Sequence, residues 1–176
     1  MLVIFSGVDR VGKTTLAKKV SVALGIPYIK FDMPKAVKME DPLLWARDIK
    51  IFHNSILQFV KRLYDCKARI NVIIDRFYPD EIVYSAVFRN IDLFEEYREI
   101  DFEFARIGTK LIYVCLPKYS ILKQRWKEES KVGIEYTASL AWKFEEFGNF
   151  TELPILIVHQ DTDIQEILNF CKDDKE

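Results

Sequence analysis

A glycine-rich stretch near the start of the chain has the residue types and the spacing of a phosphate-binding loop. Residues 7–15 read GVDRVGKTT, which fits G-x-x-x-x-G-K-[ST] at every fixed position. Glycines allow successive backbone N–H groups to point at phosphate oxygens, and the helix that follows adds its own free N–H groups. Lys13 supplies a charge for the β- and γ-phosphates, and the Thr14 hydroxyl is a ligand for Mg²⁺. The stretch therefore predicts that the chain binds a nucleoside triphosphate.

Two loop positions that the motif leaves free carry charge, and each has two interpretations. Arg10 either reaches the γ-phosphate and stabilises the group in transfer, or faces solvent at a permissive position. Asp9 puts a carboxylate beside a triphosphate, which is unfavourable unless the carboxylate has a partner. A sugar hydroxyl or Arg76 would serve; otherwise Asp9 is a turn residue.

A second charged pair, Asp75-Arg76, follows the apolar residues 71–74 (NVII). An aspartate at the end of a strand beside a phosphate loop is suited to hold Mg²⁺ or to orient the acceptor. Arg76 can bind a phosphate through two parallel hydrogen bonds. The plainer interpretation is a helix N-cap with a surface ion pair.

Short apolar strands that alternate with helices must position these side chains. We expect strands at 2–6, 27–31, 71–75, 110–116 and 154–159, and helices at 14–24, 42–67, 80–90, 93–107, 118–129, 136–147 and 163–172. The alternation predicts an α/β domain with a parallel sheet that helices cover on both faces. Ligands of such sheets bind at the carboxyl ends of the strands, where Asp9-Arg10, Asp32 and Asp75-Arg76 are expected to converge.

Three helices carry more specific signals. Gly25 is a typical C-cap of the first helix, and Asp41-Pro42 predicts an N-cap followed by proline in the first turn. In the long helix 42–67, one face is expected to be mostly core, and its residues are Phe52, Ile56, Phe59, Val60 and Leu63. The basic segment 118–132 leads to a glycine and predicts a lid, in which Arg125 is expected to contact the adenine.

The composition is that of an ordinary globular protein. The 176 residues are 49% hydrophobic and 30% charged, and we expect a single domain over 1–176. The 26 basic and 27 acidic side chains form no basic stripe, so nucleic-acid binding is not expected. Three scattered cysteines suit neither a disulfide framework nor a metal site. The apolar N-terminus reads as a strand rather than a signal peptide, and no apolar stretch is long enough for a membrane span, so a cytoplasmic protein is expected.

Together these motifs resemble the thymidylate kinase branch of the P-loop kinases. FSGVDRVGKTT (5–15) is similar to the family's opening loop, and Asp75-Arg76-Phe77 matches its Asp-Arg-aromatic motif. Leu116-Pro117 and the later Arg125 are also similar, as is Glu135-Tyr136 ahead of a helix with aromatic residues. The resemblance spans nearly the whole chain.

The resemblance implies a three-layer P-loop fold, with a five-stranded parallel sheet in the order 2-3-1-4-5 and a short lid at about 123–137. It implies transfer of the γ-phosphoryl group of ATP to the 5′-phosphate of dTMP, with Mg²⁺. Asp9 would contact the acceptor's sugar, Arg76 its phosphate, and Arg10 would be the catalytic arginine. Family members are often homodimers, so the implied partners are a small nucleotide and a second copy of the chain.

Three departures from the family keep a second acceptor open. Ser6 stands where the family commonly has Glu, residues 30–34 (KFDMP) lack the usual arginine, and Phe52 is followed by His53 rather than arginine. The related deoxynucleoside kinases place a carboxylate after the second strand as general base for a 5′-hydroxyl, and Asp32 could take that place. A regulatory ATPase that transfers phosphate to water is the third hypothesis, which the acceptor-side residues disfavour.

The expected ATP-binding residues are Gly7, Val8, Asp9, Arg10, Val11, Gly12, Lys13, Thr14, Thr15 and Arg125. The expected metal ligands are Thr14 and Asp75. The expected catalytic residues are Arg10, Lys13, Asp32, Asp75 and Arg76, and the expected substrate-binding residues are Asp9, Asp32, Phe52, Arg76, Phe77 and Tyr136.

Overall fold

Five parallel strands form one sheet in the order β2-β3-β1-β4-β5, as expected. The computed structural model describes residues 1–31, 41–115, 134–159 and 161–173. The strands are β1 (Leu2–Ser6), β2 (Tyr28–Lys30), β3 (Val72–Asp75), β4 (Lys110–Val114) and β5 (Ile155–Val158). Each predicted strand is confirmed, and its ends differ from the prediction by at most two residues. The central strand β1 is buried along its whole length, which explains its uninterrupted apolar sequence.

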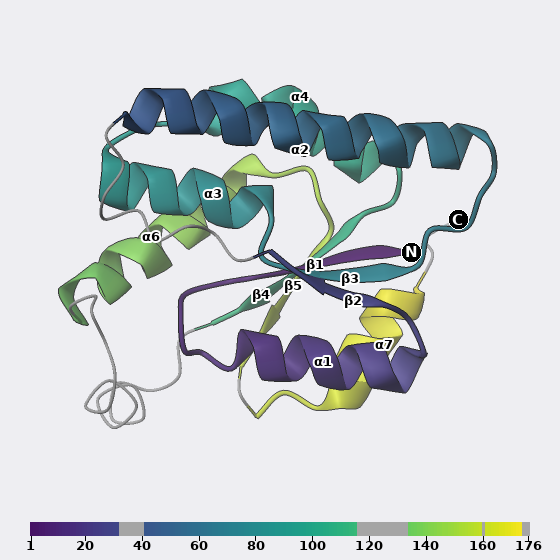
Figure 1. The fold of residues 1–176 in the computed structure, drawn as a ribbon. Helices are drawn as coiled ribbons and strands as arrows, with labels where there is room; N and C mark the ends of the chain where they lie inside the picture. The colour runs from purple at the N-terminus through teal and green to yellow at the C-terminus, as the bar shows by residue number, and fades with distance from the viewer. Residues whose placement is uncertain (32–40, 116–133, 160, 174–176) are drawn as a thin grey trace.

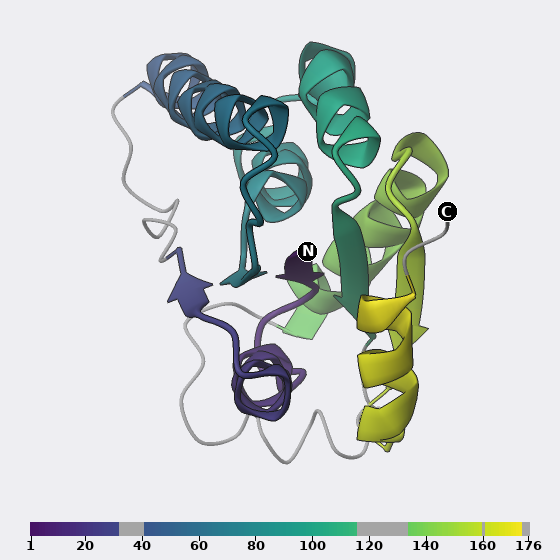
Figure 2. The same ribbon diagram turned by 90° about the vertical axis from the view of Figure 1, so that its right-hand side faces the viewer.

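Helices cover both faces of the sheet and complete three layers. Figure 1 shows α1 and α7 on one face and α2, α3, α4 and α6 on the other, and the turned view in Figure 2 agrees. The helices are α1 (Lys13–Leu24), α2 (Pro42–Asp65), α3 (Tyr78–Tyr84), α4 (Phe94–Arg106), α6 (Ile134–Phe150) and α7 (Ile164–Lys172). Within the described ranges, none of them is long and apolar enough to cross a membrane.

The two helix ends predicted from capping residues are confirmed. The Asp41 carboxylate accepts hydrogen bonds of 3.0 Å from the backbone N–H groups of Leu43 and Leu44 at the start of α2. Gly25 ends α1 in the left-handed conformation, with φ 66°.

The helix expected at 80–90 is different in the structure. It begins earlier, as α3, and at Ser85 it changes to a π-helical segment, η2 (Ser85–Arg89). Asn90 closes the segment in a left-handed conformation, with φ 54°. Such π-helical turns are rare, and they occur frequently at functional sites.

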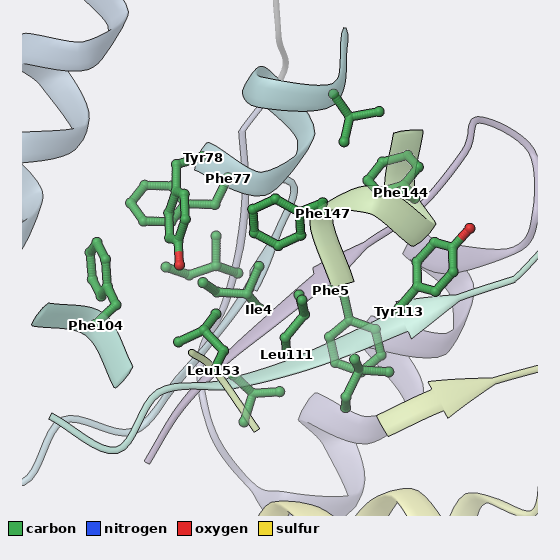
Figure 3. Packing of buried hydrophobic residues seen from close by; sticks show 14 of the residues in the cluster. Ile4, Phe5, Phe77, Tyr78, Phe104, Leu111, Tyr113, Phe144, Phe147 and Leu153 are labelled. Carbon is green, nitrogen blue, oxygen red and sulfur yellow. The ribbon is translucent and has the colours of Figure 1, made fainter. Parts of the chain in front are cut away.

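Aromatic stacking fixes α3 against α4. The Tyr78 ring stacks on Phe104 with centroids 5.4 Å apart and on Tyr97 at 6.0 Å. Figure 3 shows Phe77, Tyr78 and Phe147 above Ile4, with Phe104 to their left. The Tyr78 hydroxyl donates to the buried Asp101 carboxylate at 2.7 Å, so the ring is fixed in position as well as buried. The residues that precede and follow Tyr78 therefore have defined positions.

The prediction for the buried face of α2 is wrong for Phe52 and Phe59. Phe52 and Phe59 are 43% and 63% exposed, whereas Ala46, His53 and Leu57 are buried. Both sets have helical spacing, so the periodicity could not decide between the two faces. Of the predicted set, Val60 is buried, and Ile56 and Leu63 are half-buried. The packing of α2 against α4 selects the face that turns inward.

The first glycine of the loop lies against the end of β4. Gly7 has φ 142°, and a Cβ atom there would lie 2.5 Å from the Val114 carbonyl oxygen. The contact is between backbones, so no side chain can move to relieve it. Gly25 offers a comparison, because its φ is also positive but no atom lies within 4 Å of the added Cβ.

We expect Gly7→Ala to lower the free energy of unfolding by about 2–4 kcal/mol, through the steric contact and the unfavourable φ together. Gly25→Ala should lower the free energy of unfolding by only about 1 kcal/mol, because its positive φ is unfavourable for alanine but no steric contact is added. Urea unfolding of the two variants measures both values. Equal losses would contradict the close contact between Gly7 and β4.

Candidate active site

The pairing of β1 with β3 brings the two charged motifs to one edge of the sheet. Phe5 of β1 lies opposite Asp75 of β3, and the Arg76 N–H donates to the Phe5 carbonyl oxygen at 3.0 Å. The glycine-rich loop leaves β1 at this level, and Arg76 leaves β3. The loop and the Asp-Arg pair therefore adjoin each other, as the parallel topology predicts.

The loop has an apolar side in the core and a charged side that faces outward. Val8 and Val11 are buried, while Asp9 and Arg10 are half-buried. Arg10 adopts a left-handed conformation with φ 69°, which costs energy for a residue that has a Cβ atom. Strained residues of this kind cluster at ligand-binding sites. Thr15, by contrast, is exposed on the first turn of α1.

Lys13 is buried and paired with a carboxylate that the sequence analysis did not single out. Its side chain is 4% exposed, and its Nζ donates to the Gly7 carbonyl oxygen at 2.7 Å. Nζ also lies 3.5 Å from Asp80 Oδ1 on α3. The Ser6 hydroxyl donates to Asp80 Oδ2 at 2.7 Å. In the sequence, Asp80 looks like an ordinary acidic residue in the first turn of a helix, so no signal identified it.

The two expected metal ligands are in direct contact. The Thr14 hydroxyl donates to Asp75 Oδ2 at 2.6 Å, and the Tyr28 hydroxyl donates to the same oxygen at 2.7 Å. Asp75 is fully buried, and its Oδ1 has no hydrogen-bond partner among the described residues. Tyr28, on β2, is a second contact that the sequence analysis missed.

These residues fit Mg²⁺. Hydroxyl and carboxylate oxygens are its usual protein ligands, and one or two of them suffice when phosphates and water complete the shell. No group of three or more His, Cys, Asp or Glu side chains forms a metal cluster in the described part of the chain. A magnesium site here would therefore depend on Thr14, Asp75 and the nucleotide itself.

Asp9 and Arg76 form an ion pair across the gap between the two motifs. Arg76 is one of the two partners that we expected for Asp9. The arginine has a left-handed φ of 66°, and its guanidinium carbon lies 5.8 Å from the centre of the Tyr84 ring. The Tyr84 hydroxyl is buried without a partner among the described residues, and burial raises its pKa well above the ordinary value. Tyr84 therefore presents a neutral ring to the arginine.

Three phenylalanines lie together where β2, β3 and α2 meet. Phe31 stacks on Phe77 with centroids 5.5 Å apart and contacts the edge of Phe52 at 5.6 Å. Phe77 is fully buried, whereas Phe52 is partly exposed. Within this group, Phe52 has ring surface for a ligand and Phe77 supports the others from the core.

His53 is buried behind these rings. Its Nδ1 is hydrogen-bonded to the Tyr97 hydroxyl at 2.9 Å, and its ring lies 4.7 Å from Phe77. Burial lowers the pKa of His53 to about 3. The residue is therefore neutral near pH 7 and contributes no cation for a phosphate.

A buried polar cluster joins α2 to α3 and η2 on the same side of the site. Glu81 Oε1 accepts hydrogen bonds from Trp45 Nε1 at 3.0 Å and from Ser85 at 2.8 Å, and it forms an ion pair with Arg89. Glu81 Oε2 and Arg89 Nε are buried without partners among the described residues. The change to a π-helix at Ser85 accompanies this cluster, which the sequence analysis also missed.

The remaining expected site residues are placed only in part. Tyr136, on α6, is 42% exposed and lies 5.3 Å from the Phe88 ring. Asp32 and Arg125 lie outside the described residues, as do Leu116-Pro117 and positions 123–133 of the expected lid. Positions 134–137, expected in the lid, belong to α6.

No protein-family model matches the chain, and no curated protein sequence matches it. Among solved structures, the chain is similar to the YorR protein of Bacillus subtilis in complex with phosphorylated GDP. The TM-score is 0.69 at 22% identity, over 97% of this chain and 93% of that chain. The chain is also similar to the deoxyadenosine kinase of M. mycoides with bound dATP. There the TM-score is 0.52 at 22% identity, over 97% of each chain. These likenesses, together with the strand order, show that the chain has the expected three-layer P-loop fold.

Proposed function

We propose that the chain is a kinase that transfers the γ-phosphoryl group of ATP to a deoxynucleoside monophosphate, with dTMP as the first candidate. One observation carries the proposal. Lys13 and the Thr14–Asp75 contact lie beside the Asp9–Arg76 pair, at the carboxyl ends of neighbouring strands. Lys13, Thr14 and Asp75 would bind the phosphate donor, and Asp9 and Arg76 would bind the acceptor. Transfer between two nucleotides requires that these two sites adjoin each other.

On the donor side, the residues divide the work by their chemistry. The loop backbone binds the phosphates and Lys13 neutralises charge on them. Thr14 and Asp75 would hold Mg²⁺, which would supply positive charge to stabilise the phosphoryl group in transfer. Arg10 adds a fixed cation from within the loop, at the position where charge grows on the group in transfer.

On the acceptor side, the Asp9–Arg76 pair suits a deoxynucleotide. Arg76 offers a guanidinium for a phosphate, and Asp9 offers a carboxylate for a sugar hydroxyl. The partly exposed ring of Phe52 offers a surface for a base. The similar structures hold phosphorylated GDP in one case and dATP in the other, which supports an acceptor of the nucleotide or nucleoside class.

A deoxynucleoside kinase is the second candidate, and His53 favours it. The resemblance to thymidylate kinases implies a phosphate-binding cation after the aromatic residue on the long helix. Here that position is a buried, neutral histidine. A hydroxyl acceptor needs no such cation but does need a base, for which Asp32 is the candidate.

An acceptor survey with the purified chain, ATP and Mg²⁺ tests the proposal. We expect dTMP to yield dTDP at a rate well above ADP release without acceptor. The survey should include dUMP, the other monophosphates and the free deoxynucleosides, with products identified by mass spectrometry. ADP release that no acceptor changes would overturn the kinase proposal and favour the regulatory ATPase.

Asp32→Asn separates the two acceptors. A general base that accepts a hydroxyl proton typically increases the rate of the chemical step by about 10²–10⁴-fold. In a nucleoside kinase, Asp32→Asn should therefore lower kcat by about that factor. A monophosphate kinase should be affected only modestly, because a phosphate acceptor needs no base. Paired assays with dTMP and thymidine give the result directly.

Asp75→Asn tests the proposed metal site. We expect a loss of about 100-fold or more in kcat/KM at limiting Mg²⁺, partly recovered at high Mg²⁺, because one carboxylate ligand is weakened. Tyr28→Phe is the matched variant, since it removes a hydrogen bond to Asp75 Oδ2 and leaves both proposed ligands in place. In Tyr28→Phe, kcat/KM at limiting Mg²⁺ should fall only about tenfold. The same Mg²⁺ dependence in Asp75→Asn and the unmodified chain would contradict the assignment.

Arg10→Ala tests whether the loop arginine acts in transfer. If Arg10 stabilises the transition state, kcat should fall by about 10³-fold or more. Arg106→Ala is the control, because Arg106 pairs with Glu103 on the surface of α4 and should leave kcat unchanged. If Arg10→Ala instead raises KM for ATP and leaves kcat unchanged, Arg10 binds ATP equally well in the ground state and in the transition state.

A further inference from the structure

The lysine of the phosphate loop is paired with an anion of the protein itself. Lys13 is almost completely buried, and Asp80 is fully buried. Among the described residues, the hydrogen-bond and ion-pair partners of the Asp80 carboxylate are Ser6 and Lys13. A buried ammonium and a buried carboxylate each require the other, because burying one charge alone is costly.

The position of Asp80 does not depend on the loop. It lies in the first turn of α3, where the positive end of the helix dipole stabilises a carboxylate. The Tyr78 stack and the Tyr78–Asp101 hydrogen bond hold that turn against the core. The carboxylate therefore stays beside the loop when a ligand arrives.

We propose that Asp80 is a positioning residue with two opposite effects: it stabilises the nucleotide-free loop as the counter-ion of Lys13, and it weakens triphosphate binding. This inference rests on the triphosphate site in the proposed function. A bound triphosphate competes with Asp80 for one ammonium group, and the fixed carboxylate repels the phosphates. The apparent affinity is lower than the loop alone would provide.

The two effects predict opposite changes in one variant. Asp80→Asn keeps the size of the side chain and one acceptor oxygen but removes its charge. The nucleotide-free protein should melt at a lower temperature, because Lys13 loses its counter-ion. The Kd for ATP and for inorganic tripolyphosphate should fall about fivefold or more, because Lys13 is no longer shared. The increase in Tm on adding tripolyphosphate should then be larger than in the unmodified protein.

Asp101→Asn is the matched control. Asp101 is also a buried carboxylate, but its partners are Tyr78, Thr151 and the Glu152 N–H rather than the loop. It should lower Tm, because the Glu152 N–H loses its acceptor. It should leave the Kd for tripolyphosphate unchanged, because the remaining amide oxygen can still accept from Tyr78 and hold the turn that carries Asp80. Calorimetry gives Kd and a thermal-shift assay gives Tm, so neither measurement depends on catalysis.

The outcomes separate this inference from the proposed function. If the unmodified chain binds neither ATP nor tripolyphosphate, the proposed function fails. If it binds them and Asp80→Asn binds them equally or more weakly, the inference fails and the site stands.

A double variant covers the case in which Asp80→Asn is too unstable for calorimetry. Lys13→Met leaves Asp80 without its cation, whereas Lys13→Met with Asp80→Asn removes both charges. We expect the double variant to melt at a higher temperature than Lys13→Met alone. A double variant that is no more stable than Lys13→Met would overturn the counter-ion role.

Discussion

The parallel pairing of β1 with β3 is the constraint on which the candidate active site depends. It sets Phe5 opposite Asp75, so the phosphate loop and the Asp-Arg pair leave the sheet at the same level. A shift of one residue would turn Asp75 to the other face of the sheet and away from Thr14. Gly7 makes the arrangement possible on the other side of β1, because only a residue without a Cβ atom can pass the end of β4.

Charge pairing is the second organising feature of the site. Three buried or half-buried ion pairs lie along it: Lys13–Asp80, Arg76–Asp9 and Arg89–Glu81. Both acidic residues of the first turn of α3 take part, so this helix contacts the loop through Asp80 and α2 through Glu81. Its position is set by the stacking of Tyr78 on Phe104 and by the hydrogen bond from Tyr78 to Asp101. The aromatic core thus determines where the carboxylates stand.

Much of the fold could be predicted because local signals decide it. Apolar runs bounded by turn residues located all five strands, and capping residues located the ends of α1 and α2. The errors arose where two local patterns compete. In α2, Phe52 and Phe59 fit a helical repeat as well as His53 and Leu57 do, and contact with α4 and with the Phe77 ring selects the buried set. The π-helical turn at Ser85 likewise accompanies a cluster built from α2 and α3 together.

By itself, the sequence determined the phosphate loop and the Asp75-Arg76 motif, because each consists of contiguous residues. It also determined the parallel architecture, because apolar strands and helices alternate along the chain. Only the tertiary structure decided the partners: Asp80 for Lys13, Tyr28 for Asp75 and Tyr84 beside Arg76. These partners come from other elements and carry no distinctive spacing, so nothing in the chain marks them in advance. Burial also decided the charge state of His53, since the same histidine on a surface would keep an ordinary pKa.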